Sequence, residues 1–192
     1  MKVREYLFMQ VALIQVAVFL INIIFNFYIT LVLLRFLLQW VKADFYNPYC
    51  QLLIKFTNFF LVPLRRIIPG FFGLDIAALV LIFLLQAAQI ILLALIFKNP
   101  MHAWLNIWLL VPIVTSLVTL VLNTYFYAIL IRAVLSWINP DPYNPMFHIL
   151  IQLTEPVLKP IRKILPEFSG FDFSPLVILI LIQVILIFVR NI

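Results

Sequence analysis

RFLLQWVKADFYNP at residues 35–48 and RAVLSWINPDPYNP at residues 132–145 are two versions of one stretch, 97 positions apart. The same register holds without a gap over most of the chain, and its matches include Trp, Pro, Asn, Arg, Asp and Gly rather than interchangeable aliphatic residues. The chain is therefore a tandem duplication. Its period far exceeds the roughly 20–50 residues of solenoid and propeller repeats, so we expect two sub-domains, 1–97 and 98–192.

The composition is that of a membrane protein. Apolar residues make up 66% of the chain and charged residues only 10%, whereas soluble domains carry roughly 25% charged residues. A helix needs about 20 apolar residues to cross a bilayer. The apolar stretches that predict spanning helices are Tyr6–Leu38, Ile76–Phe97, Trp104–Leu135 and Phe171–Val189. The first is too long for the apolar region of a signal peptide and contains no small-residue cleavage pattern, so we keep it as a span.

Each copy contains two predicted spans joined by a connector of some 35 residues. Two spans return the chain to its starting side, so the copies are parallel repeats and both connectors share one face of the membrane. We therefore predict an all-α membrane protein with four transmembrane helices as two tandem parallel repeats. Each repeat is expected to consist of a transmembrane helix, an interfacial amphipathic helix and a second transmembrane helix.

The connectors carry the clearest local signals. Asn47 and Asn144 each precede a proline, Pro48 and Pro145, and this pair is typical of a helix N-cap followed by the first helical position. Polar and apolar residues then alternate at helical spacing. We expect an amphipathic helix of about 12 residues, roughly 18 Å long and too short to span a bilayer, which the next proline (63 or 160) ends.

Acidic and basic residues flank these connector helices. Asp75 and Asp172 come just before the second span of each repeat, where a carboxylate favours a helix N-terminus. Arg35 precedes Trp40 by five positions, and Arg132 precedes Trp137 by five. Two interpretations have equal weight: each arginine reaches the lipid phosphates beside a Trp anchor, or it pairs with a connector aspartate, Asp44 or Asp141.

The basic residues also bear on topology. Nine of the 13 Lys and Arg residues lie on the connector face, which predicts a cytoplasmic position for the connectors. The basic N-terminus argues for the opposite orientation. Two pairs, Arg65–Arg66 and Arg162–Lys163, follow the connector helices. Anionic lipid binding is one interpretation of these pairs, but a role in orienting the protein is favoured.

Polar residues also occur inside two predicted spans. Asn22 and Asn26 lie on one face of the first span, and Thr119 and Asn123 lie on one face of the third. Amides and hydroxyls in lipid usually bond to neighbouring helices, whereas ion and proton paths usually carry ionisable groups. Packing between helices is therefore favoured over a path for a solute.

No arrangement of residues predicts catalysis. The two histidines, His102 and His148, fall on opposite faces of the membrane in this topology, and Cys50 has no histidine nearby in the sequence. No Cys or His cluster has the spacing of a metal site. We expect neither an enzyme nor a bound cofactor.

The second copy carries a specific resemblance. Its matching segments are Leu135–Trp137, Asn139–Pro145, Thr154–Pro156, Pro160–Lys163, Pro166 and Gly170–Pro175. Together they resemble the repeat of the YggT family of small bacterial inner-membrane proteins, which has relatives in cyanobacteria and chloroplasts. The first copy departs from the pattern at three places: Lys42–Phe45 replaces Asn139–Pro142, Asn58 replaces Glu155, and Ala77–Ala78 replaces Ser174–Pro175.

The resemblance implies an accessory protein of the inner membrane, because members of the family are associated with osmotic tolerance, division, envelope organisation and assembly of a plastid cytochrome complex. Two hypotheses follow. The protein is a structural or assembly factor with a docking surface on its connectors, or it is a small channel or transporter component with a path between its polar stripes. The expected partners are the lipid bilayer, anionic lipid included, and other membrane proteins, not nucleic acid. Self-association remains open.

Overall fold

The computed structural model describes residues 2–70, 73–97, 110–137, 144–164 and 172–191, with the backbone alone for 2–8 and 137. These residues form helices and short turns. The helices are α1 Lys2–Trp40, α2 Pro48–Ile67, α3 Ile76–Ile96, α4 Leu110–Trp137, α5 Pro145–Ile164 and α6 Ser174–Arg190.

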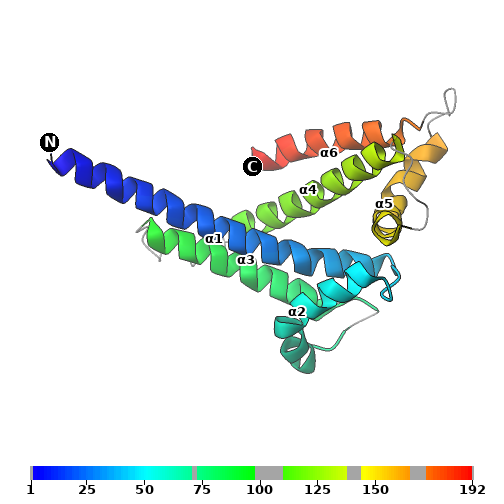
Figure 1. Ribbon diagram of the computed structural model, residues 1–192, viewed down its shortest axis with the longest axis horizontal. Helices are drawn as coiled ribbons and strands as arrows, with labels where there is room; N and C mark the ends of the chain where they lie inside the picture. Colours follow the sequence, from blue (N-terminus) through cyan, green and yellow to red (C-terminus); the bar gives the residue numbers. More distant parts are fainter. Residues whose placement is uncertain (1, 71–72, 98–109, 138–143, 165–171, 192) are drawn as a thin grey trace.

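The helices form two hairpins of the same plan. In the first repeat α1 packs along α3, and in the second α4 packs along α6. The connector helices α2 and α5 meet at their N-terminal ends, on the side of the molecule away from the N-terminus (Figure 1). Both connectors thus share one end, as parallel repeats require. Helix α5 also contacts α1, so the second connector packs against both repeats.

Three of the four predicted spans have the length and composition to cross a membrane: Met9–Trp40, Ile76–Ile96 and Leu110–Ser136. The fourth, α6, is apolar but has 17 residues, about 26 Å of helix against a bilayer core of about 30 Å. The outer faces of these helices are strongly apolar. Phe27, for example, is 65% exposed and Leu13 64%, which suits a lipid surface rather than water. Residues 104–109 and 171 of the predicted spans lie outside the described residues.

The connector helices are longer than predicted. Each has 20 residues and continues through the proline that was expected to end it, Pro63 in α2 and Pro160 in α5, so that prediction was wrong. A proline removes one hydrogen bond and bends a helix without ending it when packing holds both sides. Leu61 and Leu158, fully buried just before these prolines, supply such packing. At about 30 Å these helices are long enough to cross a bilayer core, so their polar and basic residues, not their length, set them apart from the spans.

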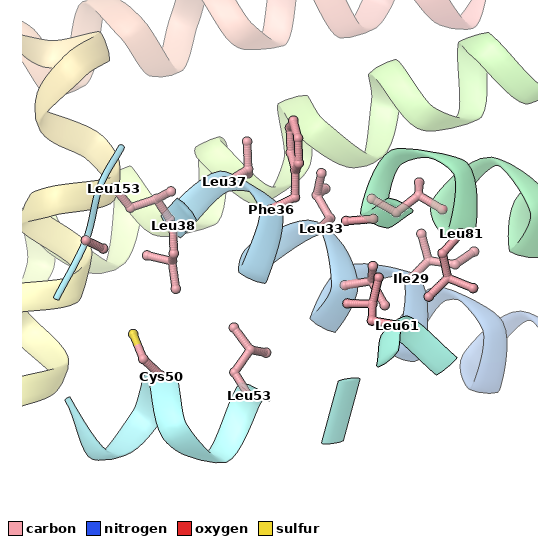
Figure 2. Packing of buried hydrophobic residues seen from close by; sticks show 14 of the residues in the cluster. Ile29, Leu33, Phe36, Leu37, Leu38, Cys50, Leu53, Leu61, Leu81 and Leu153 are labelled. Carbon is pink, nitrogen blue, oxygen red and sulfur yellow. The ribbon is translucent and has the colours of Figure 1, made fainter. Parts of the chain in front are cut away.

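The main core lies where α1 meets the connectors. Ile29 of α1 and Leu61 of α2 are fully buried, and Figure 2 shows Cys50 and Leu53 of α2 on the side of the helix that faces α1. Leu153 of α5 joins the same cluster. A second cluster, Ile129, Leu158, Ile178, Ile182 and Leu186, holds α5 against α4 and α6. The buried apolar contacts therefore fix the connector helices on the ends of the hairpins.

Two residues with positive φ shape the turns of the first connector. Lys42 has φ 54°, and the backbone N–H of Ala43 donates to the carbonyl of Leu38 at 2.9 Å, which closes the end of α1. Gly73 has φ 79°, a conformation that glycine adopts without a Cβ clash. Gly170, its counterpart in the second repeat, lies outside the described residues.

Candidate functional site

The connector helices begin at the predicted caps. Asn47 Oδ1 accepts from the backbone N–H of Tyr49 at 3.0 Å, and Asn144 Oδ1 accepts from that of Met146 at 2.9 Å. Pro48 and Pro145 occupy the first helical position, so the N-cap prediction is confirmed in both repeats.

The starts of the two connector helices also contact each other. Asn47 Nδ2 donates to the carbonyl of Pro145 at 2.7 Å, and the backbone N–H of Asp44 donates to Gln152 Oε1 at 3.2 Å. The carboxylate of Asp44 accepts from the backbone N–H of Tyr46 at 2.9 Å. These bonds join the repeats at the connector end.

Arg35 points from α1 into α2. Its side chain donates from Nη1 to Thr57 Oγ1 at 2.6 Å and to Asn58 Oδ1 at 2.8 Å, and the residue is only 5% exposed. Among the described residues Arg35 therefore bonds to α2 and forms no ion pair with Asp44. Trp40 is 63% exposed at the end of α1, as an interfacial anchor would be.

Arg132 makes the matching contact in the second repeat. Its Nη1 donates to Thr154 Oγ1 at 2.7 Å, and its Nη2 donates to the Glu155 carboxylate at 2.8 Å. The threonine hydroxyls donate in turn to carbonyls of their own helices, Thr57 to Leu53 and Thr154 to Leu150. The other predicted partner of this arginine, Asp141, and the side chain of Trp137 lie outside the described residues.

Glu155 extends this contact into a chain of charges. Its second oxygen accepts from Arg162 Nη1 at 2.9 Å, and Arg162 Nε donates to Asp172 at 2.7 Å. Asp172 also accepts from the backbone N–H of Ser174 at 2.9 Å and from the Ser174 hydroxyl, just before α6. We call Arg132, Thr154, Glu155, Arg162 and Asp172 the repeat-2 cluster. Its two positive and two negative charges alternate and balance.

The pKa values of the repeat-2 cluster follow from these contacts. Partial burial raises the pKa of Glu155, but hydrogen bonds and charge from Arg132 and Arg162 outweigh it, so the pKa lies below its ordinary value. Burial likewise raises the pKa of Asp172, and its bonds to Ser174 and Arg162 bring it below normal. Burial lowers the pKa of Arg162, but Asp172 and Glu155 raise it above normal. Glu155, Arg162 and Asp172 are therefore all charged at neutral pH.

The first repeat has the equivalent residues, except that Asn58 stands in place of Glu155. Arg65 pairs with Asp75, and Asp75 also caps α3 by accepting from the backbone N–H of Ala78 at 3.2 Å. We call Arg35, Thr57, Asn58, Arg65 and Asp75 the repeat-1 cluster. Because the amide of Asn58 replaces a carboxylate, no ion pair joins Arg35 to Arg65 and Asp75 within the described residues.

The second basic residue of each predicted pair has a different environment. Arg66 and Lys163 are exposed, and neither belongs to an ion pair among the described residues. Only the first member of each pair, Arg65 or Arg162, enters a cluster.

The intramembrane polar residues meet around one pocket. It has a volume of about 570 Å³ and lies between α1, α3, α4 and α6. Its lining includes the predicted Asn22, Asn26, Thr119 and Asn123, together with Gln86 and Gln89 of α3. Gln89 Nε2 donates to Asn22 Oδ1 at 2.9 Å and to Asn26 Oδ1 at 3.4 Å. In the first repeat these amides therefore bond between helices.

The described residues contain no group of three or more His, Cys, Asp and Glu side chains that could hold a metal ion. Cys50 is buried, and burial together with the nearby charge of Asp44 raises the pKa of its thiol, which disfavours a reactive thiolate. His148 lies in α5, and His102 lies outside the described residues.

Several residues of the clusters and of the intramembrane pocket were not singled out by sequence reasoning. Thr57, Thr154 and Gln89 are the main ones. The sequence did contain a signal for the threonines, because the repeat alignment pairs Thr57 with Thr154 and each follows its arginine by 22 positions. No comparable signal marked Gln89, because its counterpart in the second repeat is Leu186.

Comparison with known proteins gives a consistent result. The CCB3/YggT family model matches twice, over residues 14–96 and 111–192. An uncharacterized protein of Pseudomonas aeruginosa is 38% identical over 91% of this chain and 88% of its own length. The uncharacterized protein YggT of Escherichia coli K12 is 34% identical over 87% of this chain and 85% of its own. The uncharacterized protein ycf19 of Guillardia theta is 40% identical over 37% of this chain and 79% of its own. No solved structure matches. The predicted resemblance is confirmed.

Proposed function

We propose that this chain, which belongs to the CCB3/YggT family, is a non-enzymatic accessory protein of the bacterial inner membrane. Its role is structural or in assembly, in envelope organisation, division or the biogenesis of membrane complexes. The observation that carries the proposal is the connector platform, which we define as residues 44–67 and 145–164.

The connector platform is anchored in three ways. One arginine of a span bonds to each connector helix, the buried Arg35 to α2 and the partly buried Arg132 to α5. The bond from Asn47 to the carbonyl of Pro145 joins the two helices. Buried leucines such as Leu61 and Leu158 hold the helices against the hairpins. Such a surface loses little conformational entropy when a partner binds, which favours docking.

Exposed aromatic and apolar side chains surround the junction of the two helices. Tyr46 is 94% exposed, Tyr49 is 50% exposed and Met146 is 48% exposed. We assign this area to a partner protein, since Tyr and Met are enriched at protein interfaces. Farther along α2, Phe56 and Phe59 are 56% and 76% exposed. We assign them to the membrane interface, where aromatic rings anchor helices.

We further propose four spans, with α6 as the fourth, and connectors in the cytoplasm. The excess of Lys and Arg on the connector face supports this orientation. The test is labelling of single cysteines at Lys42 and Lys55 in a Cys50→Ala background, with a membrane-impermeant thiol reagent. Both should resist the reagent in intact cells and react after permeabilisation. Labelling of both in intact cells would reverse the topology.

Site-specific photo-crosslinking in native membranes tests the docking role. A photoreactive phenylalanine analogue replaces Tyr46, and a matched control carries it at Ile180, which is 56% exposed on the far helix α6. We expect the Tyr46 probe to give a discrete adduct with the same membrane protein in repeated preparations, identified by mass spectrometry. The Ile180 probe should not give it. Equal adducts from both positions, or none from Tyr46, would contradict docking at the platform.

The intramembrane pocket favours a second candidate, a channel or transporter component in the osmotic response. The polar stripes of the two repeats line one pocket, and a path would need such a lining. Asn26→Leu and Asn123→Leu test it in liposomes that contain the protein alone. Under the accessory proposal, none of the proteins gives solute or ion flux above that of empty vesicles. A flux that both substitutions abolish would support the channel and contradict the accessory role.

A further inference from the structure

The repeat-1 cluster carries one unbalanced positive charge. Arg35 and Arg65 contribute two positive charges, and Asp75 alone opposes them. The repeat-2 cluster has two of each sign because Glu155 bridges Arg132 and Arg162. A guanidinium that is only 5% exposed loses most of its hydration, and neutral partners replace that hydration poorly.

Two of the three guanidinium nitrogens of Arg35 make no hydrogen bond within the described residues. Both of its side-chain bonds leave from Nη1, and within the described residues Nε and Nη2 donate to nothing. In the second repeat, the corresponding Nη2 of Arg132 holds Glu155. No fully buried side-chain nitrogen in the described part of the chain lacks a partner, so Nε and Nη2 of Arg35 retain some exposure. Arg35 also lines a pocket.

That pocket has a volume of about 600 Å³ and is lined by Arg35, Gln39, Arg65, Gly70, Gly73 and Asp75, among others. Small-ligand sites typically measure roughly 300–1,000 Å³. Arg35 precedes the end of α1 by five residues, about 8 Å of helix, and that end carries Trp40, a residue type that favours the level of lipid headgroups. It contains two guanidinium groups, an amide and one carboxylate already paired with Arg65.

We propose that this pocket binds a phosphate group, held by Arg35 Nε and Nη2 with Arg65 on its rim. A guanidinium fork matches the oxygens of phosphate in a bidentate manner and is the preferred partner of buried anions. The phosphate takes the place that the Glu155 carboxylate fills in the second repeat. Its source is an anionic phospholipid headgroup or free inorganic phosphate. The proposal rests on the repeat-1 cluster alone and is independent of the docking role.

The test is ligand binding by purified full-length protein in neutral detergent and phosphate-free buffer. Short-chain phosphatidylglycerol, short-chain phosphatidylcholine and inorganic phosphate are titrated separately, and bound ligand is counted by native mass spectrometry. We expect one tight site for phosphatidylglycerol and at least tenfold weaker binding of phosphatidylcholine. Tighter binding of inorganic phosphate than of phosphatidylglycerol would assign the site to the free ion. Absence of both from the wild-type protein would overturn the proposal.

Two variants of equal net charge locate the site. Asn58→Glu supplies an internal carboxylate to Arg35 and should weaken binding at least tenfold. Arg66→Ala lowers the net charge by the same amount on an exposed neighbour outside the pocket, and should change affinity less than twofold. Asn58→Gln keeps a neutral amide and should retain binding, and the melting temperatures of all variants report folding. Equal affinity of Asn58→Glu and wild type would overturn the proposal, as would equal losses from Asn58→Glu and Arg66→Ala.

Discussion

Arg35 and Arg132 occupy equivalent places in the two repeats, and each donates from Nη1 to a threonine on its connector helix at 2.6 and 2.7 Å. Beyond this shared bond the repeats diverge. In the second repeat Glu155 pairs with both Arg132 and Arg162, and Arg162 pairs with Asp172 just before α6. In the first repeat Asn58 accepts a hydrogen bond from Arg35.

The difference shows how duplication can preserve a framework and change its electrostatics. The shared bonds hold the connector helix of each repeat against its span, and both connector helices have 20 residues and an asparagine cap. The two clusters differ at one position, which is Asn58 in the first repeat and Glu155 in the second. The charges of the repeat-2 cluster therefore balance, whereas the repeat-1 cluster retains one positive charge. The phosphate site proposed above lies in the repeat that retains this positive charge.

Loss of Glu155 should have the largest effect on stability. Glu155→Ala leaves Arg132 and Arg162 without their shared carboxylate, and we expect a loss of about 2 kcal/mol in the free energy of unfolding. Asn58→Ala, the matched change, should cost about 1 kcal/mol because one bond to Arg35 is lost. Denaturant titration in detergent micelles measures both. A larger loss from Asn58→Ala would contradict the comparison.

The converse substitution should make the first repeat resemble the second. Asn58→Glu places a carboxylate beside Arg35 and Arg65, and in phosphate-free buffer it should raise the free energy of unfolding by about 1.5 kcal/mol. Asn58→Gln controls for side-chain size and should not stabilise the protein. The same titration tests this prediction, and destabilisation by Asn58→Glu at neutral pH would refute it.

The helix caps should differ by one hydrogen bond. Asn144→Ala removes a cap and should cost about 1 kcal/mol. Asn47→Ala also removes the bond to the carbonyl of Pro145 and should cost a further 0.5 kcal/mol or so. Circular dichroism melting of both variants compares them. Equal melting temperatures would show that the bond between the repeats contributes nothing.

The smallest predicted effect is the loss of stability at acidic pH. The pKa values of Glu155 and Asp172 are depressed in the folded protein, so their stabilising contribution is complete above their ordinary values. It is lost as the pH falls from about 4.5 through the folded values. Both side chains are more than a third exposed, so we expect less than about 1 kcal/mol from each. Melting temperature between pH 7 and 3.5 should therefore fall less steeply in Glu155→Gln than in wild type. Identical slopes would contradict this assignment.

Sequence reasoning was strongest where the chemistry is local. Asn-Pro pairs predicted the starts of α2 and α5, because a cap and a proline act on the nearest backbone groups. Hydrophobic length located α1, α3 and α4. The predicted ends of the connector helices at Pro63 and Pro160 were wrong, because tertiary packing around Leu61 and Leu158 decides whether a proline bends or ends a helix.

Contacts between helices were harder to predict. The arginines were recognised as candidate residues, but their partners are 22 and 23 positions away on another helix, and spacing alone did not distinguish them from the nearer Asp44. The amides of the intramembrane pocket raise the same difficulty, since Gln89 meets Asn22 only through the packing of α3 on α1. The repeat register, which aligns Asn58 with Glu155, pointed to the difference between the clusters.

A pair of double-mutant cycles tests the central claim most directly. One combines Arg132→Met with Glu155→Gln, and the other combines Arg35→Met with Asn58→Ala, all measured as free energies of unfolding in neutral detergent and phosphate-free buffer. Direct contacts typically couple by about 0.5–3 kcal/mol. We predict a coupling in the second repeat at least twice that in the first, because the partner of Arg132 in its cycle is a carboxylate and the partner of Arg35 is an amide. Equal couplings, or a larger one in the first repeat, would contradict the account.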